Sequence, residues 1–281
     1  MDAKIAIVTY RQPHHLQRAY LSAGTEYQTE DKFVVINNHS QFSFDGCAKI
    51  LHNKVRPDSS LGNLARSWNQ ALLWTFGSAV TPSCDWVCLL QGDAKLSEGW
   101  AFSLQQLIES GLEFIACGPG DQAVFMSIKA FKLLGWWDER FCGIGYHEFD
   151  YFLRAYLRLG KAAAFEGHAP ALSWNWQHST RLIERMLDDH PGHSSKVNPM
   201  LLKHLIEKWG LDVVRHIVFF GDNTKELQCW REYLDAQYGS EAERLSVGPR
   251  SNYPMEYNWY PHFYQGSTEN YQDLYLGYCP I

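Results

Sequence analysis

Two acidic segments contain residue types that could carry out group-transfer chemistry. Asp93 follows the apolar run DWVCLL in the tripeptide QGD, and Glu148 and Asp150 lie in the segment GYHEFDYFLR. A carboxylate at the end of a strand can hold a hard cation against a diphosphate, and a second carboxylate can take a proton from a hydroxyl group. The alternative for Asp93 is an ordinary turn or helix-capping residue. We therefore treat Asp93 as a candidate cation ligand and Glu148 as a candidate general base.

The second segment predicts a glycine-rich loop followed by a helix. Helical spacing runs over Tyr151–Leu159, and Asp150 lies four residues before Arg154, so the two can form an ion pair. We expect Glu148 and Asp150 in or just before the first helical turn, where the helix dipole favours negative charge and Asp150 can cap the helix. The competing interpretation makes Asp150 the base and Glu148 a loop residue.

Strands and helices alternate along the first half of the chain and must position these carboxylates. The predicted strands are Lys4–Thr9, Lys32–Asn37, Asp85–Leu90, Phe114–Cys117 and Ala123–Ser127, and the predicted helices include Leu61–Phe76 and Leu96–Ser110. Such alternation is typical of an α/β fold with a mostly parallel sheet flanked by helices. Ligands bind such sheets at the carboxyl ends of the strands.

The alternation ends after Lys161. Helical spacing is predicted over Arg181–Tyr238, and Ser251–Ile281 is rich in Tyr, Pro and Asn. We expect an α/β domain over residues 1–180 and a helical, Tyr-rich C-terminal extension over residues 181–281. The many rings of the tail are costly to leave in water, so we expect it to cover an acceptor cleft or a partner subunit of a homo-oligomer.

Composition excludes several classes of protein. The 281 residues are 46% hydrophobic and 20% charged, which excludes a disordered or fibrous chain. The formal net charge of -6 disfavours a nucleic-acid partner. Because the sequence has no leader-like start and no apolar run of about 18 residues, we expect a cytoplasmic protein without a transmembrane segment. Seven unclustered cysteines indicate reduced thiols.

The order of the segments resembles the nucleotide-sugar glycosyltransferases of the GT-A fold, in particular the large inverting group related to rhamnosyl and cellulose-type transferases. The resemblance rests on IAIVTY, FVVINNHS, G-x-x-A-R-x-x-N-x-A at Gly62–Ala71, the strand ending in QGD, GWWDERF and H-E-F-D-x-x-x-R, and it covers roughly residues 4–180. It implies a GT-A domain, a divalent cation (Mn²⁺ or Mg²⁺), a nucleotide-sugar donor of the UDP type and a saccharide or glycoconjugate acceptor.

The resemblance also assigns roles to individual residues. The acidic DxD triplet of the family falls on Gln91, Gly92 and Asp93, so only the last carboxylate, usually the metal ligand, is kept. The base position falls on Glu148, and the acid that precedes it in the family is His147 here. A second metal ligand is expected at His178, with His168 as the alternative.

The remaining expected contacts involve the donor nucleotide and the sugars. Besides the triplet, the expected nucleotide contacts are Thr9, Tyr10, Arg11, Asn37, Asn38 and Arg66, and the expected sugar contacts are Asp121, Trp136, Trp137, Tyr146 and His147. For the two tryptophans the alternative is packing in the core.

Two other functions stay open at this level. The changed QGD triplet is compatible with a non-catalytic nucleotide-sugar or carbohydrate-binding module of the same fold. A glycosyltransferase that acts on modified bases in DNA is the second alternative, and the negative net charge disfavours it.

Overall fold

The computed structural model describes residues 2–10, 12–38, 42–52, 64–78, 80–118, 121–141, 146–165, 182–186, 204–206 and 208–209. The Tyr-rich tail, and with it the predicted cover over an acceptor cleft or a partner subunit, lies outside these residues. So do Arg11, His168 and His178.

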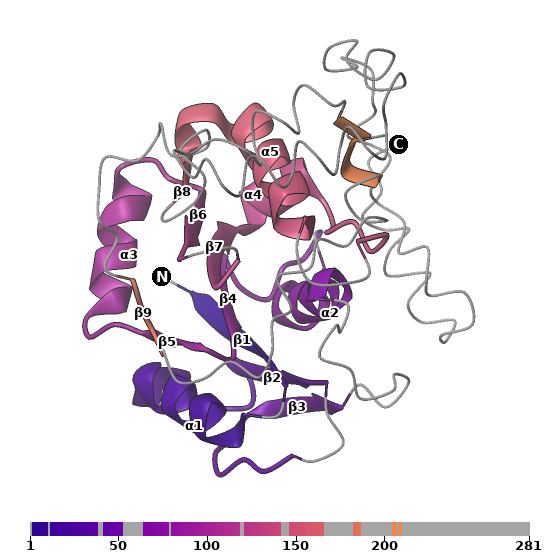
Figure 1. Cartoon of the computed structure of the whole chain (residues 1–281). Helices are drawn as coiled ribbons and strands as arrows, with labels where there is room; N and C mark the ends of the chain where they lie inside the picture. The colour runs from indigo at the N-terminus through magenta and orange to yellow at the C-terminus, as the bar shows by residue number, and fades with distance from the viewer. Residues whose placement is uncertain are drawn as a thin grey trace, which may run out of the picture.

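A seven-stranded sheet forms the centre of the domain (Figure 1). Its strands are β1 (Ala3–Thr9), β2 (Phe33–Asn37), β3 (Lys49–His52), β4 (Trp86–Gln91), β6 (Phe114–Cys117), β7 (Ala123–Ser127) and β8 (Ala163–Phe165), in the order β3-β2-β1-β4-β7-β6-β8. Only β7 runs antiparallel to its neighbours in this sheet. The expected α/β fold with a mostly parallel sheet is confirmed.

Helices cover both faces of the sheet. They are α1 (Pro13–Ser22), α2 (Leu64–Phe76), α3 (Trp100–Glu109), α4 (Ile128–Leu134) and α5 (His147–Leu159), with short 3-10 turns η1 (Thr25–Tyr27) and η2 (Gly160–Ala162). Side chains alternate between the faces along each strand. Ile5 and Ile7 of β1 therefore join the cluster with α1 and α3, whereas Ala6 and Val8 join the cluster with α2, α4 and α5.

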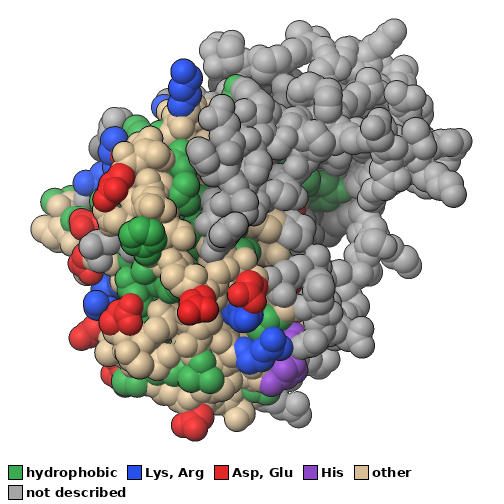
Figure 2. All heavy atoms as spheres, turned by 90° about the vertical axis from the view of Figure 1, so that its left-hand side faces the viewer, with side chains coloured by type: hydrophobic (Ala, Val, Ile, Leu, Met, Phe, Trp, Pro, Cys, Tyr) green, Lys and Arg blue, Asp and Glu red, His purple; other side chains and the backbone are tan. Residues whose placement is uncertain are grey.

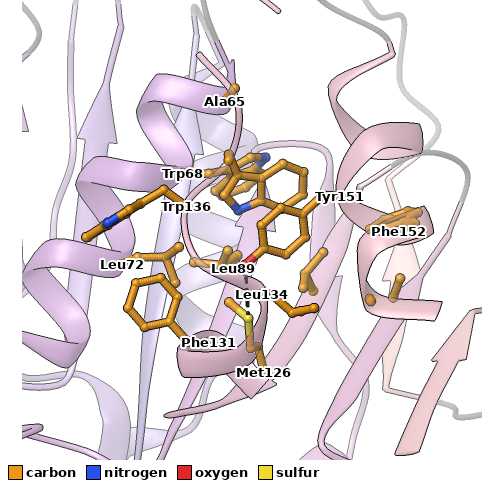
Figure 3. Packing of buried hydrophobic residues seen from close by; sticks show 14 of the residues in the cluster. Ala65, Trp68, Leu72, Leu89, Met126, Phe131, Leu134, Trp136, Tyr151 and Phe152 are labelled. Atoms are coloured by element: carbon orange, nitrogen blue, oxygen red, sulfur yellow. Dashed lines mark hydrogen bonds between the residues drawn. The ribbon is translucent and has the colours of Figure 1, made fainter. Parts of the chain in front are cut away.

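Aromatic residues dominate the cluster beneath α2, α4 and α5 (Figure 3). The hydroxyl group of Tyr151 donates to the backbone oxygen of Gly135 over 2.8 Å and contacts the sulfur of Met126 at 3.4 Å. Tyr151 is fully buried, and these contacts fix the first turns of α5 against the sheet.

A second, two-stranded sheet corrects one sequence-based prediction. Residues 183–185 were expected to be helical, but they form β9 (Ile183–Arg185), which pairs antiparallel with β5 (Ala94–Leu96). The ladder bonds that β5 offers outweigh the local helical spacing. Residues 204–206 and 208–209 are helical, as predicted.

The charge of the surface and the length of the helices bear on nucleic-acid and membrane binding. On the face shown in Figure 2, acidic and basic side chains of the described residues are interspersed, unlike the basic surface that binds nucleic acid. Among the described residues, no helix combines the length and the apolar character needed to cross a membrane.

Candidate active site

The carboxyl ends of β1 and β4 lie side by side at one edge of the sheet. Val8 pairs with Gln91 in the register of these two strands, so Thr9 and Gly92 follow at neighbouring positions. A Cβ atom built on Gly92 would lie 3.4 Å from the backbone oxygen of Val8 and 3.6 Å from the Cα atom of Thr9. These are ordinary van der Waals distances, so the two chain segments pack directly against each other at Gly92.

The start of β7 comes to the same edge because β7 runs antiparallel to β4. Ala123 pairs with Leu90, and the backbone N–H of Gln91 donates to the backbone oxygen of Gln122 over 2.8 Å. Asp121 and Gln122 therefore lie beside the QGD triplet, about 30 residues away in sequence. Parallel strands alone would have carried them to the opposite edge.

Asp93 is buried and held by Gln122. The side-chain amide nitrogen of Gln122 donates to Oδ2 of Asp93 over 2.9 Å, and the backbone oxygen of Asp93 accepts from the N–H of Met186 over 2.7 Å. Asp93 is 4% exposed and Gln122 is 3% exposed. The Oε1 atom of Gln122 is buried and accepts no hydrogen bond. The edge thus offers a fixed carboxylate and a neighbouring amide oxygen.

These oxygen donors supply part of the coordination that a hard divalent cation needs. Mg²⁺ and similar ions are commonly bound by one or two carboxylates together with substrate phosphates and water. Asp93 is a carboxylate of this kind, and it follows a strand at the carboxyl edge, where a diphosphate would bind. Within the described ranges no group of three or more His, Cys, Asp and Glu residues could hold a metal ion, and the expected second ligand, His178, lies outside them.

Asp121 is the centre of a buried polar cluster. Its carboxylate accepts from the indole nitrogen of Trp68, from the amide nitrogen of Gln91 and, over 2.9 Å, from Nε2 of His147. Burial acts to raise the pKa of Asp121, but the positive charge of His147 and the donated hydrogen bonds outweigh it and lower the pKa. The expectation that Asp121 contacts a sugar hydroxyl is corrected, because the carboxylate is 2% exposed and engaged by protein donors.

The other ring nitrogen of His147 faces Glu148. Its Nδ1 atom lies 3.2 Å from Oε2 of Glu148, and the Glu148 side chain is 12% exposed whereas that of His147 is 1% exposed. Burial raises the pKa of Glu148, the negative charge of Asp121 raises it further, and the charge of His147 opposes both effects. A partly exposed side chain whose carboxyl group has a raised pKa suits a general base near neutral pH. His147 itself is too buried for the sugar contact expected of it.

Helix α5 begins directly after a strained residue. Tyr146, the N-terminal flanking residue of the helix, has φ 67°, the only positive φ of a non-glycine residue in the described part of the chain. It is 7% exposed, which leaves little surface for the expected sugar contact. No side chain caps the helix, so the predicted capping role of Asp150 is wrong. Strained backbone of this kind often occurs next to functional residues, here His147 and Glu148.

Asp150 is saturated by protein groups. Its Oδ2 atom accepts from Arg154 over 2.9 Å, as the predicted i, i+4 pair requires, and its Oδ1 atom accepts from the indole nitrogen of Trp209 over 2.9 Å and faces Lys208 at 2.5 Å. Burial would raise the pKa of Asp150, but the charges of Lys208 and Arg154 lower it. With no exposed surface, Asp150 is poorly placed to serve as the base.

The same lysine reaches a second buried carboxylate. Asp138 accepts from Lys208 over 2.9 Å, forms an ion pair with Arg140 at 2.6 Å, and lies 3.2 Å from Nε2 of His204. The predicted pair of Asp150 and Arg154 thus belongs to a larger network with Asp138 and Lys208. The part that includes Lys208 was not predicted, because Lys208 and Asp138 are 70 residues apart and no local pattern relates them.

Trp136 and Trp137 belong to the hydrophobic core. Both are 1% exposed, and the Trp137 ring stacks on Tyr151 with centroids 4.0 Å apart. Trp136 meets Phe131 edge to face at 4.9 Å (Figure 3). The prediction that these rings stack on a sugar is corrected for both. The alternative, packing in the core, is what the structure shows.

The expected nucleotide contacts at the ends of β1 and β2 are near one another. The backbone N–H of Asn38 donates to the backbone oxygen of Thr9 over 3.1 Å, and the Asn38 amide donates to Ser67 over 3.0 Å. The Asn37 amide nitrogen lies 3.1 Å from Nδ1 of His52. Ser67 lies on α2, directly after the half-buried Arg66, and Tyr10 is half-buried as well. These residues therefore line the same sheet edge as the QGD triplet.

Comparisons with known proteins were made at the level of sequence and of structure. No family model matches the sequence, and no curated protein matches it. Solved structures similar to this chain include several glycosyltransferases. One is glucosyl-3-phosphoglycerate synthase from Mycobacterium tuberculosis with Mn²⁺, UDP and glucosyl-3-phosphoglycerate, at 10% identity and a TM-score of 0.47, covering 79% of this chain and 81% of that chain. Another is GalNAc-T7 with UDP, GalNAc and Mn²⁺, at 12% identity and a TM-score of 0.48, covering 88% and 52%.

Other similar structures are, like GalNAc-T7, matched over less than two thirds of their length. A mannosyltransferase from Pyrobaculum calidifontis in complex with GDP-Man and Mn²⁺ has 11% identity and a TM-score of 0.39, with 60% of this chain and 57% of that chain covered. The match spans 34% of S. aureus TarS and 56% of a structure of its residues 1–349. Because all these TM-scores lie below 0.5, the chemistry has to be judged from the residues of this chain.

Proposed function

We propose that this protein is an inverting glycosyltransferase that moves a sugar from a nucleotide diphosphate to a hydroxyl group of a saccharide or glycoconjugate. One observation carries the proposal. A continuous series of side chains and neighbouring residues links the candidate cation ligand to the candidate base: Asp93 contacts Gln122, its neighbour Asp121 contacts His147, and His147 contacts Glu148. This series of contacts supports the assignment of Asp93 and Glu148 to one site.

The proposed step is a single displacement. The acceptor oxygen gives its proton to the Glu148 carboxylate and forms a bond with the anomeric carbon, while the bond from that carbon to the diphosphate oxygen breaks and its electron pair leaves with the nucleotide diphosphate. Attack opposite the leaving group inverts the anomeric centre, and positive charge spreads over the sugar ring as in glycoside hydrolysis. A single base is sufficient for this route.

The leaving diphosphate needs compensation for its negative charge. Asp93 would hold a divalent cation there, and such an ion when bound supplies electrostatic stabilisation of the leaving group. Gln122 fixes the Asp93 carboxylate through its amide N–H. Thr9, Asn37 and Asn38 lie at the adjacent strand ends and Arg66 lies on α2, and we place the nucleotide there. A UDP-sugar is the donor that we expect.

Donor turnover separates this function from a non-catalytic binding module. Thermal unfolding of the full chain is recorded with UDP-sugars and GDP-sugars, with and without Mn²⁺, since a ligand of the native state raises its apparent stability. Any stabilising donor is then incubated with Mn²⁺, with and without a panel of saccharide acceptors, and products are identified by NMR. A product of inverted anomeric configuration supports the proposal. A donor that binds without hydrolysis or transfer indicates the binding module, and a product of retained configuration excludes the single displacement.

A further inference from the structure

The charge state of His147 is constrained by the groups on both sides of its ring. Asp121 accepts hydrogen bonds from Trp68 and Gln91 in addition to the contact with Nε2 of His147. A carboxylate that already accepts hydrogen bonds from Trp68 and Gln91 is favoured in its ionised form and holds no proton to give, so the proton of the 2.9 Å contact belongs to Nε2.

The second ring nitrogen lies 3.2 Å from the Oε2 atom of Glu148. These two atoms are not aligned for a hydrogen bond, but at this distance a positive charge on the ring is attracted to the Glu148 carboxylate as it is to that of Asp121. The charged side chains of the described residues that contact the ring are these two carboxylates, Asp121 from the segment before β7 and Glu148 from α5. The positive end of the α5 dipole opposes a cation at this position, but two full charges in contact outweigh a partial charge.

We infer that Asp121 is a positioning residue that holds His147 as an imidazolium ion between two carboxylates, and that this cation keeps Glu148 ionised and oriented to accept the proton of the acceptor hydroxyl. This inference rests on the proposed function for the role of Glu148. It assigns Trp68 and Gln91 the task of fixing Asp121. Of Asp121, His147 and Glu148, only Glu148 would contact the reacting atoms.

A spectroscopic experiment tests the charge state without any substrate. The chain has 12 histidines, so the ring signals of His147 are identified as those missing from the His147→Gln variant of the ¹⁵N-labelled protein. At pH 7 the wild-type ring should show two protonated nitrogens. In Asp121→Asn, which keeps acceptor capacity for Trp68 but removes the charge, the ring should be neutral. A neutral ring in the wild type overturns the inference, and this measurement stands even if the Asp121 variant does not fold.

A kinetic experiment tests the coupling to Glu148. Asp121→Asn should lower kcat by about tenfold to a hundredfold, the usual effect of losing a supporting residue, with the donor KM nearly unchanged. Asp121→Asn removes the negative charge of Asp121, which raises the pKa of Glu148, and with it the positive charge of His147, which lowers this pKa more strongly. The pKa of Glu148 should therefore rise, and the acidic limb of the kcat–pH profile should move to higher pH. His147→Gln should move it in the same direction, and the double variant should be no slower than His147→Gln alone.

The matched control is Glu113→Gln, which neutralises a hydrogen-bonded carboxylate at the amino end of β6 and should leave the profile in place. Additive losses in the double variant with an unmoved acidic limb would show that Asp121 and His147 act only through stability. If the wild-type protein turns over no donor, the proposed function fails, and the ring signals still decide the charge state of His147.

Discussion

The ammonium nitrogen of Lys208 lies 2.5 Å from Oδ1 of Asp150 and 2.9 Å from Oδ2 of Asp138, and all three side chains are buried. Burial lowers the pKa of Lys208 even though both carboxylates act to raise it. The lysine thus joins the helical residues 204–206 and 208–209 to the first turn of α5 and to the segment before it. The contact explains why a carboxylate two residues from the candidate base is structural.

The first prediction concerns the stability supplied by this network. Asp150→Asn should lower the free energy of unfolding by about 3–5 kcal/mol, because the buried cations Lys208 and Arg154 would keep only Asp138 as a carboxylate of this network. A capping role alone would cost about 1 kcal/mol. Urea unfolding measures the difference, with Lys129→Met as the control, since its exposed ion pair with Glu113 should contribute no more than about 1 kcal/mol.

The second prediction concerns the base. Glu148→Gln keeps the size of the side chain but removes the proton acceptor, so kcat should fall about a hundredfold to ten-thousandfold. Donor affinity should change little, because the carboxylate acts on the acceptor. Steady-state kinetics and donor titration measure the two effects. If Asp150→Asn, assayed where it is fully folded, loses turnover while Glu148→Gln stays active, the base is Asp150.

The third prediction is a pH dependence. Glu148 must be ionised to act, and its pKa is raised above 4.5 by burial, so kcat should rise with pH through a midpoint above that value. The free energy of unfolding should change with pH in the opposite direction. Because the folded state favours the protonated form of Glu148, this residue contributes stability at low pH, and the contribution is lost as pH rises through the folded pKa. Glu148→Gln should therefore gain stability relative to the wild type over that window. Equal pH dependence in both proteins would contradict the raised pKa.

The fourth prediction concerns the cation. Asp93→Asn should abolish the Mn²⁺-dependent part of UDP binding while the protein stays folded, because one charged ligand is lost and no cavity is created. Calorimetry with and without Mn²⁺ measures this. Asp85→Asn is a matched control, since Asp85 is exposed at the opposite end of β4. Binding that keeps its Mn²⁺ dependence in Asp93→Asn would remove Asp93 from the site.

The fifth prediction separates backbone strain from a contact. Gly118 and Gly99 have φ values of 80° and 72°, so an alanine at either position should cost about 1–2 kcal/mol. A methyl group at Gly118 would also press against the amide of Gln122, 3.0 Å from its Cβ atom, whereas nothing lies within 4 Å at Gly99. Gly118→Ala should therefore weaken Mn²⁺-dependent UDP binding beyond its effect on stability, and Gly99→Ala should not. Equal binding by the two variants would show that the Gln122 contact does not support Asp93.

The sequence by itself determined the elements of the domain. Apolar runs bounded by polar residues predicted Phe114–Cys117 and Ala123–Ser127 with the bounds that the structure gives, and predicted β1, β2 and β4 to within a residue or two. Such strands are buried on both faces, so their hydrophobic runs are continuous and visible in the sequence. The i, i+4 pair of Asp150 and Arg154 was visible for a similar reason, because helix geometry fixes it locally.

Only the tertiary structure decided which polar residues meet. The antiparallel direction of β7 brings Asp121 and Gln122 to Gln91 and Asp93, and no local pattern encodes that direction. Burial was likewise decided by the tertiary structure. Trp136 and Trp137 are of the residue type that stacks on sugars, but they lie in the core. The Glu148 side chain stays partly exposed, while Asp150, two residues later, faces Lys208 from the C-terminal part of the chain. Contacts between segments distant in sequence depend on the packing of the whole chain, which local spacing does not specify.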